Sequence, residues 1–362
     1  MKIFVFGSSI TSSYWNGAAT YYRGIYKELH RREHEITFAE PDAYGRQQKR
    51  DAGDFSYVTS VVYHTADDIP TLLKLAAGCD LVIKHSGVGV FDEMLEARVL
   101  DCGSSQTRVA FWDVDAPATL ARLQADQADP LHRHIPVYDF VFTYGGGPPV
   151  ITRYARLGAV NCHPIYNGLD PETHYPVVAD PALRCDLMFI GNRLPDRESR
   201  VEEFLLRAAA LAPELQFCLG GEGWAGKAMP DNVRWLGHVS TEDHNRLNCS
   251  SRMVLNINRN SMAEVGFAPP TRIFEAAGAS ACVITDRWSG IEQFFFPGKE
   301  ILIAESAEDV VRHLKQFPLA KAREIGANMR RRALAEHSYK LRAEQFESIV
   351  TEASTRAARV AS

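Results

Sequence analysis

Residues 269–286 read PPTRIFEAAGASACVITD. Two prolines and a threonine open a predicted helix, a glycine closes it, and a short apolar run that ends in an aspartate follows. Thr271 is the expected N-cap residue. Glu275 lies about one turn into a helix whose other residues suit a buried position. It either pairs with Arg272, three residues before it, or binds a ligand.

The same order of short apolar runs and longer amphipathic segments extends over most of the chain. Before residue 160 it predicts strands at 2–7, 34–42, 80–85, 107–115 and 138–147, with helices at 17–32, 68–78, 91–100 and 148–157. Beyond residue 184 it predicts strands at 185–192, 215–221, 232–239, 252–258 and 300–305, with helices at 196–211, 241–251, 306–334 and 338–358. Buried strands separated by helices indicate an α/β fold with parallel sheets covered on both faces.

The alternation is interrupted at 168–183, where three prolines indicate a linker. A length of 362 residues is too great for one typical core and suits two domains. We therefore expect two Rossmann-like domains, 1–172 and 173–337, facing each other across a cleft, with a terminal helical segment at 338–362. Ligands of such sheets bind beyond the carboxyl ends of the strands, so each domain can hold one substrate.

The composition narrows the partners and the compartment. Forty Lys and Arg against forty-five Asp and Glu give a net charge of −5, so no affinity for nucleic acid is expected. Seven scattered cysteines, with no CxxC pair, indicate buried thiols in a reducing compartment and neither a disulfide framework nor a zinc site. No signal segment or membrane span is apparent, which makes the cytoplasm the expected location.

Three segments carry a family resemblance: FIGNRLPDRESRVEEF (189–204), WLGHVSTEDHNRLNCSSRMVLNINR (235–259) and PPTRIFEAAGASACVITDRWSGIEQFFFPGKEILIA (269–304). They resemble the C-terminal half of GT-B glycosyltransferases, and most of all the subgroup related to the spore maturation protein CgeB. The resemblance is good over about 185–305, whereas the first 170 residues match in general layout. It implies a hexosyltransferase-type enzyme with an acceptor domain at 1–172, a nucleotide-sugar donor domain at 173–337, and a last helix that packs back on the first domain.

The resemblance also implies a donor site. Glu275 would accept hydrogen bonds from the ribose hydroxyls, and the N-terminus of its helix would hold the pyrophosphate. Gly191 allows close approach of a ligand to the backbone, and arginine suits phosphate oxygens. His238 or Val239 would lie near the base of the nucleotide. The expected donor-binding residues are Gly191, Asn192, Arg193, His238, Val239, Asn258, Arg259, Thr271, Arg272 and Glu275.

One departure limits the expected chemistry. Many retaining GT-B enzymes carry a second glutamate eight residues before the one at position 275, and here that place is taken by Phe267. Glu264 is close but out of register. The two-glutamate pattern and its retaining course are therefore not supported.

The first domain supplies the candidates for acceptor contact and proton transfer. The loop GSSITSSYWNGAA (7–19) runs from strand to helix, and Ser13, Asn16 and Gly17 are expected to contact the acceptor or the phosphates. A base is needed if the acceptor is deprotonated, and His85 and Asp115 are ranked equally, ahead of Asp113. Each of them can also be read as a polar strand-end residue that caps the next helix.

The expected function is transfer of a sugar from a nucleotide diphosphate-sugar to an unidentified acceptor, which is a small molecule, a glycan or a protein. No metal or other cofactor is expected, because arginines and helix N-termini can stabilise the leaving diphosphate. Two alternatives remain open: a sugar-nucleotide epimerase of the same fold, and a non-catalytic nucleotide-sugar-binding protein. A dehydrogenase is disfavoured because neither half carries a GxGxxG fingerprint.

Overall fold

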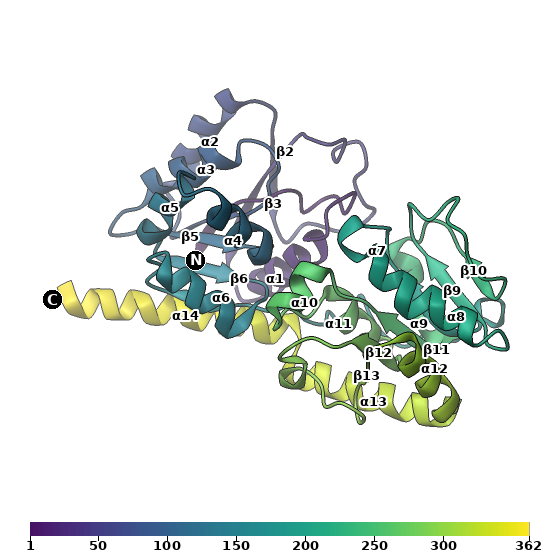
Figure 1. Cartoon of the computed structure of the whole chain (residues 1–362). Coiled ribbons are helices and arrows are strands. Elements are labelled where there is room, and N and C mark those ends of the chain that lie inside the picture. Colours follow the sequence, from purple (N-terminus) through teal and green to yellow (C-terminus); the bar gives the residue numbers. More distant parts are fainter. Residues whose placement is uncertain (362) are drawn as a thin grey trace. The chain divides into compact units, whose positions relative to one another are not determined.

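A computed structural model describes residues 1–361, and of 354–361 it describes the helical backbone alone. The contacts divide the chain into two compact units, Met1–Asn167 with Tyr339–Ser362, and Gly168–Ser338. The boundaries predicted from the sequence, after residues 172 and 337, lie within a few residues of these. Each unit is an α/β structure with its own sheet (Figure 1).

The first unit is built on a seven-stranded sheet. Its strands are β1 (Lys2–Phe6), β2 (Glu35–Pro41), β3 (Thr59–Tyr63), β4 (Leu81–His85), β5 (Arg108–Asp113), β6 (Phe140–Thr143) and β7 (Cys162–Pro164). Its α-helices are α1 (Ala19–Arg31), α2 (Ile69–Ala76), α3 (Asp92–Arg98), α4 (Ala116–Ala125), α5 (Leu131–His134), α6 (Gly147–Arg156) and α14 (Tyr339–Ala361). Helix α14 packs against α1, so the last segment of the chain completes this unit.

The second unit is built on a six-stranded sheet. Its strands are β8 (Cys185–Ile190), β9 (Phe217–Gly220), β10 (Val233–Trp235), β11 (Ser251–Asn256), β12 (Val283–Asp286) and β13 (Leu302–Ala304). Its α-helices are α7 (Pro195–Val201), α8 (Ala208–Leu211), α9 (His244–Ser250), α10 (Asn260–Val265), α11 (Thr271–Gly278), α12 (Ala307–Gln316) and α13 (Leu319–Glu336). A π-helical segment, Glu202–Arg207, joins α7 to α8.

The two sheets share one topology. Their strand orders are β3-β2-β1-β4-β5-β6-β7 and β10-β9-β8-β11-β12-β13, and every paired strand is parallel to its neighbour. The order reverses between β1 and β4 in one unit and between β8 and β11 in the other. Ligands of open parallel sheets bind beyond the carboxyl ends of the strands at such a reversal. The topology therefore directs attention to the loops after β8 and β11.

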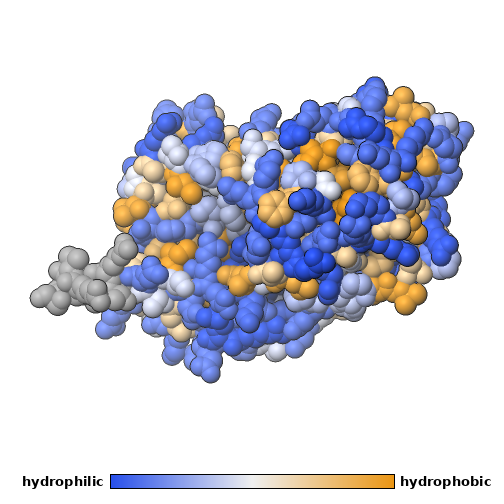
Figure 2. All heavy atoms as spheres, turned by 90° about the horizontal axis from the view of Figure 1, so that it is seen from below, coloured by the Kyte–Doolittle hydropathy of each residue, from blue (hydrophilic) through white to orange (hydrophobic). Residues whose placement is uncertain are grey.

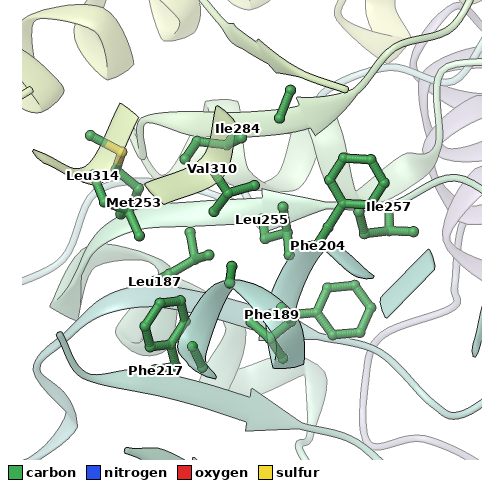
Figure 3. Close-up of a cluster of buried hydrophobic side chains, with 14 of the residues drawn as sticks. Leu187, Phe189, Phe204, Phe217, Met253, Leu255, Ile257, Ile284, Val310 and Leu314 are labelled. Atoms are coloured by element: carbon green, nitrogen blue, oxygen red, sulfur yellow. The ribbon is translucent and has the colours of Figure 1, made fainter. Parts of the chain in front are cut away.

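The hydrophobic core of the second unit supports the strands β8 and β11, which carry these loops. Apolar side chains from β8, β9, β11 and β12 meet residues of α12 and of the helical segment after β8 (Figure 3). Leu187, Leu255 and Ile284 are each fully buried between the sheet and these helices. Strands buried on both faces explain the nearly continuous apolar runs in the sequence.

On the face drawn in Figure 2, hydrophilic residues predominate and hydrophobic ones are scattered among them. Among the described residues, no helix has the length and apolarity needed to cross a bilayer.

Candidate functional site

Two arginine side chains converge on the glycine that follows β8. A Cβ atom at Gly191 would lie 2.8 Å from Nη2 of Arg197 and 3.0 Å from Nη2 of Arg272. Both guanidinium groups also lie over the ring of Phe189, at 5.5 and 5.3 Å from its centroid. A Cβ here would have to displace the ends of both arginine side chains, so the backbone after β8 and two cations meet at one point.

The electrostatics of this pair favour an anion. Burial and then the nearby charges of Arg272 and Arg259 lower the pKa of Arg197 to about 9. Arg197 donates to the carbonyl oxygen of Asn192 at 2.6 Å, and its Nε is buried without a hydrogen-bond partner. Among the described residues, Arg272 has no hydrogen bond or salt bridge, and burial lowers its pKa. Two close cations with so little local compensation are stabilised by a bound phosphate or carboxylate.

Helix α11 begins one residue earlier than the sequence predicts. Thr271 is the first helical residue, and the N-cap position belongs to Pro270, whose side chain makes no capping hydrogen bond. The prediction of Thr271 as N-cap is therefore wrong, because the extended conformation of Pro270 precedes the helix directly. The first turn lies next to Arg272 and adds the positive end of the helix dipole to the arginine pair.

Glu275 does not pair with Arg272. Its Oε2 lies 3.5 Å from Nδ1 of His244, and its Oε1 lies 3.9 Å from Nε2 of His174. Burial alone would raise the pKa of Glu275, but the hydrogen bond from His244 and the charges of both histidines and Arg272 lower it to about 2. No sequence pattern predicted this cluster, because His174 comes from the linker about a hundred residues before α11.

A second cluster of polar residues lies at the carboxyl ends of β11 and β12. The backbone N–H of Asn258 donates to both carboxylate oxygens of Asp286, at 3.3 and 3.2 Å, and Arg200 pairs with the same carboxylate. The amide oxygen and nitrogen of the Asn258 side chain are buried without a hydrogen-bond partner. Nε of Arg259 pairs with Asp196 at 3.1 Å. Asn258 therefore carries unused hydrogen-bonding capacity at the carboxyl edge of the sheet.

The remaining predicted donor residues lie in neighbouring loops. Arg193, which was predicted to reach phosphate oxygens, pairs with Glu198 at 2.6 Å, so its charge is largely compensated. Arg197 lies at Gly191 instead. Oδ1 of Asn192 accepts from the backbone N–H of Glu222, whose carboxylate lies 3.5 Å from His238.

His238 is exposed, with 71% of its side chain accessible. Val239 packs against Gly220 at the end of β9. Arg197 was not among the predicted donor-binding residues, although it lies inside one of the segments that carry the family resemblance.

In the first unit, the loop after β1 is held by internal hydrogen bonds. The carboxylate of Glu40 accepts from the backbone N–H and hydroxyl of Thr11, and Ser13 bonds to Asp51 through its backbone N–H and its hydroxyl. The side-chain amide of Asn16 donates to the carbonyl oxygen of Ser9 at 2.7 Å. Gly17 is exposed and has open space around it. The polar side chains of Ser13 and Asn16 thus shape the loop.

His85 belongs to the core of the first unit. Only 1% of the residue is exposed, its Nε2 is 2.6 Å from the hydroxyl of Tyr26, and the rings of Tyr22 and Trp112 flank it. Burial lowers its pKa to about 3. An acceptor hydroxyl has no access to this imidazole, so the placement argues against His85 as the base.

The two aspartates after β5 differ from each other. Asp113 is fully buried and accepts hydrogen bonds from the hydroxyls of Ser86, Thr119 and Tyr154. Burial raises its pKa. Asp115 is half-buried at the N-cap of α4, where its carbonyl oxygen accepts from the N–H of Thr119. Asp115 is thus the more accessible of the two carboxylates.

The burial of His85 has a measurable consequence for stability. Its folded pKa lies below the unfolded value, so its contribution to stability is complete above about pH 6.5 and is lost as the pH falls towards 3. Between pH 8 and pH 5 the free energy of unfolding of the first unit should fall by about 2 kcal/mol from this group. Hydrogen exchange of β4 and β5 amides in His85→Gln should lack that share of the pH dependence. Equal pH profiles for wild type and variant would contradict the assignment.

Two parallel sheets of this order, each with a ligand edge at its strand reversal, define a doubly wound two-domain protein. The comparisons with known proteins make the class specific. Residues 197–348 match a family model described as glycosyl transferase-like. No significant match to a curated protein sequence was found.

Three solved structures share the fold. HepE of Anabaena, in complex with UDP and glucose, is 11% identical, with 97% of this chain and 100% of that chain covered and a TM-score of 0.67. Sucrose-phosphate synthase from Thermosynechococcus elongatus is 14% identical, with full coverage of both chains and a TM-score of 0.66. An alpha-glucosyltransferase in complex with UDP and a 13-mer DNA is 11% identical, with 97% and 99% covered and a TM-score of 0.72.

The chain therefore has the GT-B fold, and the sequence-based prediction of fold class is confirmed. The prediction of a glycosyltransferase agrees with the family match over most of the second unit.

Proposed function

We propose that the protein is a glycosyltransferase that takes a hexose from a UDP-sugar. The observation that carries this proposal is the pair Arg197 and Arg272, which meets the start of α11 at Gly191 and forms a cationic site for a diphosphate. Several of the structural neighbours were solved with UDP or a UDP-sugar, which supports UDP as the nucleotide. Similarity to the CgeB-related subgroup stays a prediction.

In this proposal the second unit binds the donor. Arg197, Arg272 and the N–H groups of α11 hold the diphosphate, Glu275 accepts from the ribose, and the loop with His238 and Val239 lies near the base. The side-chain amide of Asn258 bonds to the sugar or the diphosphate. Asn192, Arg193 and Arg259 then shape the surrounding loops through their internal pairs.

The proposed reaction breaks the bond between the anomeric carbon and the diphosphate oxygen and forms one between that carbon and an acceptor oxygen. The acceptor proton passes to a base, and UDP leaves with the bonding electrons. Asp115 is the candidate base that we retain, because burial removes His85 from reach. The charge on leaving UDP is stabilised by the arginines without Mg²⁺ or Mn²⁺.

Calorimetric titration with UDP, GDP and dTDP in the absence of added divalent cations tests the donor site. We expect UDP to bind in the micromolar range and more tightly than the other two. Failure to bind any nucleoside diphosphate would overturn the proposal. A strict requirement for Mg²⁺ or Mn²⁺ would overturn its metal-independent part.

Incubation with a UDP-hexose and no acceptor separates the remaining classes. A transferase is expected to leave the hexose configuration unchanged, apart from slow release of UDP. Formation of an epimer would assign the chain to the epimerases. The proposed acceptor is a small molecule, a glycan or a protein.

The proposed location is a reducing compartment such as the cytoplasm, which the free state of all seven cysteines supports.

A further inference from the structure

Three ligand-type side chains converge in the second unit. His174, His244 and Glu275 each offer one atom to a common point, and these atoms all lie within 4.8 Å of one another. The separations from Glu275 are 3.5 Å to Nδ1 of His244 and 3.9 Å to Nε2 of His174. Tetrahedral zinc, with bonds of about 2.0–2.2 Å, needs neighbouring ligand atoms about 3.4 Å apart. The two separations go to different carboxylate oxygens of Glu275, so binding of such an ion requires His174 and Glu275 to move closer together.

The Nε2 atom of His174, which lies in the linker, makes no hydrogen bond within the described part of the chain. Only 2% of the His174 side chain is exposed, and Nε2 is buried without a hydrogen-bond partner. Its distance from Glu275 is too long for a hydrogen bond. A buried, unsatisfied polar atom costs about 1–3 kcal/mol, so a nitrogen left in this state points to a partner that the protein chain does not supply.

The linker is held against α9 and α11 by contacts that do not involve the imidazole rings of His174 and His244. The side chain of Asn245 donates to the carbonyl oxygen of Thr173 at 2.9 Å and accepts from the N–H of Tyr175 at 3.3 Å, which fixes the backbone on both sides of His174. A Cβ atom at Gly278 would lie 2.6 Å from the carbonyl oxygen of His174 and 2.8 Å from its Cβ. The absence of a side chain at Gly278 thus lets the linker lie directly on α11.

We propose that His174, His244 and Glu275 bind one Zn²⁺ or a similar first-row transition-metal ion. Two imidazole nitrogens and one carboxylate are a ligand set for such ions, whereas Mg²⁺ prefers oxygen alone. The fourth position is open to water. The ion joins the linker, α9 and α11, and it fixes the Glu275 carboxylate. This role is separate from neutralising a diphosphate, and the inference stands without the proposed function.

Cobalt(II) titration of the untagged, chelator-treated full chain is the direct test. We expect one equivalent to bind, with the visible ligand-field bands of a four- or five-coordinate site, and Zn²⁺ to displace it. His174→Asn and His244→Asn should each weaken binding by more than about 100-fold, since loss of an outer partner of a metal ligand alone costs about 10–100-fold. His64→Asn, which removes an exposed imidazole 3.3 Å from Asp42, is the matched control and should bind as wild type does.

The wild-type measurement keeps the test decisive if a histidine variant fails to fold. Uptake of clearly less than one equivalent, or spectra typical of hexaaqua cobalt, would overturn the proposal. So would equal affinity in folded His244→Asn and wild type. Calorimetry with UDP on the metal-free protein reports on the donor site separately, so failure of one proposal is distinguishable from failure of the other.

Discussion

Replacing Arg272 with alanine should weaken UDP binding by about 100-fold, which corresponds to about 2.7 kcal/mol. The guanidinium lies beside Gly191 and has no hydrogen bond or salt bridge among the described residues, so its charge is available to a phosphate. Its removal leaves Arg197 as the one cation beside that glycine. Calorimetry with UDP on the purified variant measures the loss directly.

The matched control is Arg287→Ala. Arg287 belongs to the same unit, but its side chain is 57% exposed and pairs with Glu305. UDP affinity should be unchanged in this variant. An Arg272→Ala protein that is folded and binds UDP as wild type does would remove the arginine pair from the donor site.

Replacing Gly326 with alanine should destabilise the second unit by about 3 kcal/mol and lower its Tm by about 6–12 °C. Gly326 lies in the middle of α13, which packs on α11, and it is buried. An added Cβ would overlap the carbonyl oxygen of Ser280 and lie 2.8 Å from the carbonyl carbon of Ala281. These are backbone atoms of the turn that follows α11, so α13 must move away from that turn.

The sign of this effect makes it a strong test, because alanine normally stabilises a helix by about 1 kcal/mol relative to glycine. Scanning calorimetry or circular dichroism gives the Tm. Gly17→Ala is the control, since a Cβ there has nothing within 4 Å and should leave the Tm nearly unchanged. A Gly326→Ala protein as stable as wild type would show that α13 and α11 are not closely packed. Because α11 carries Arg272 and Glu275, UDP affinity should fall along with stability.

The fold class and most strands followed from the sequence, whereas the two edge strands of the first sheet did not. Runs such as IFVFG (3–7) and LMFIG (187–191) are apolar throughout because β1 and β8 are covered on both faces. Strands β3 and β7, which were not predicted, are the two edges of the first sheet. Their partly exposed residues carry little apolar pattern. The helices α4 and α5 were missed as well.

The candidate site shows the same division. The sequence by itself determined two α/β units, the helix α11 with the short strand after it, and the presence of arginine and glutamate on the first turns of that helix, because these depend on local periodicity and residue type. Only the tertiary structure decided that Arg197 stands beside Arg272 and that His85 is enclosed by aromatic rings. It also placed His174 and His244 against Glu275. These contacts join segments far apart in the chain, and their distances depend on packing that no local pattern encodes.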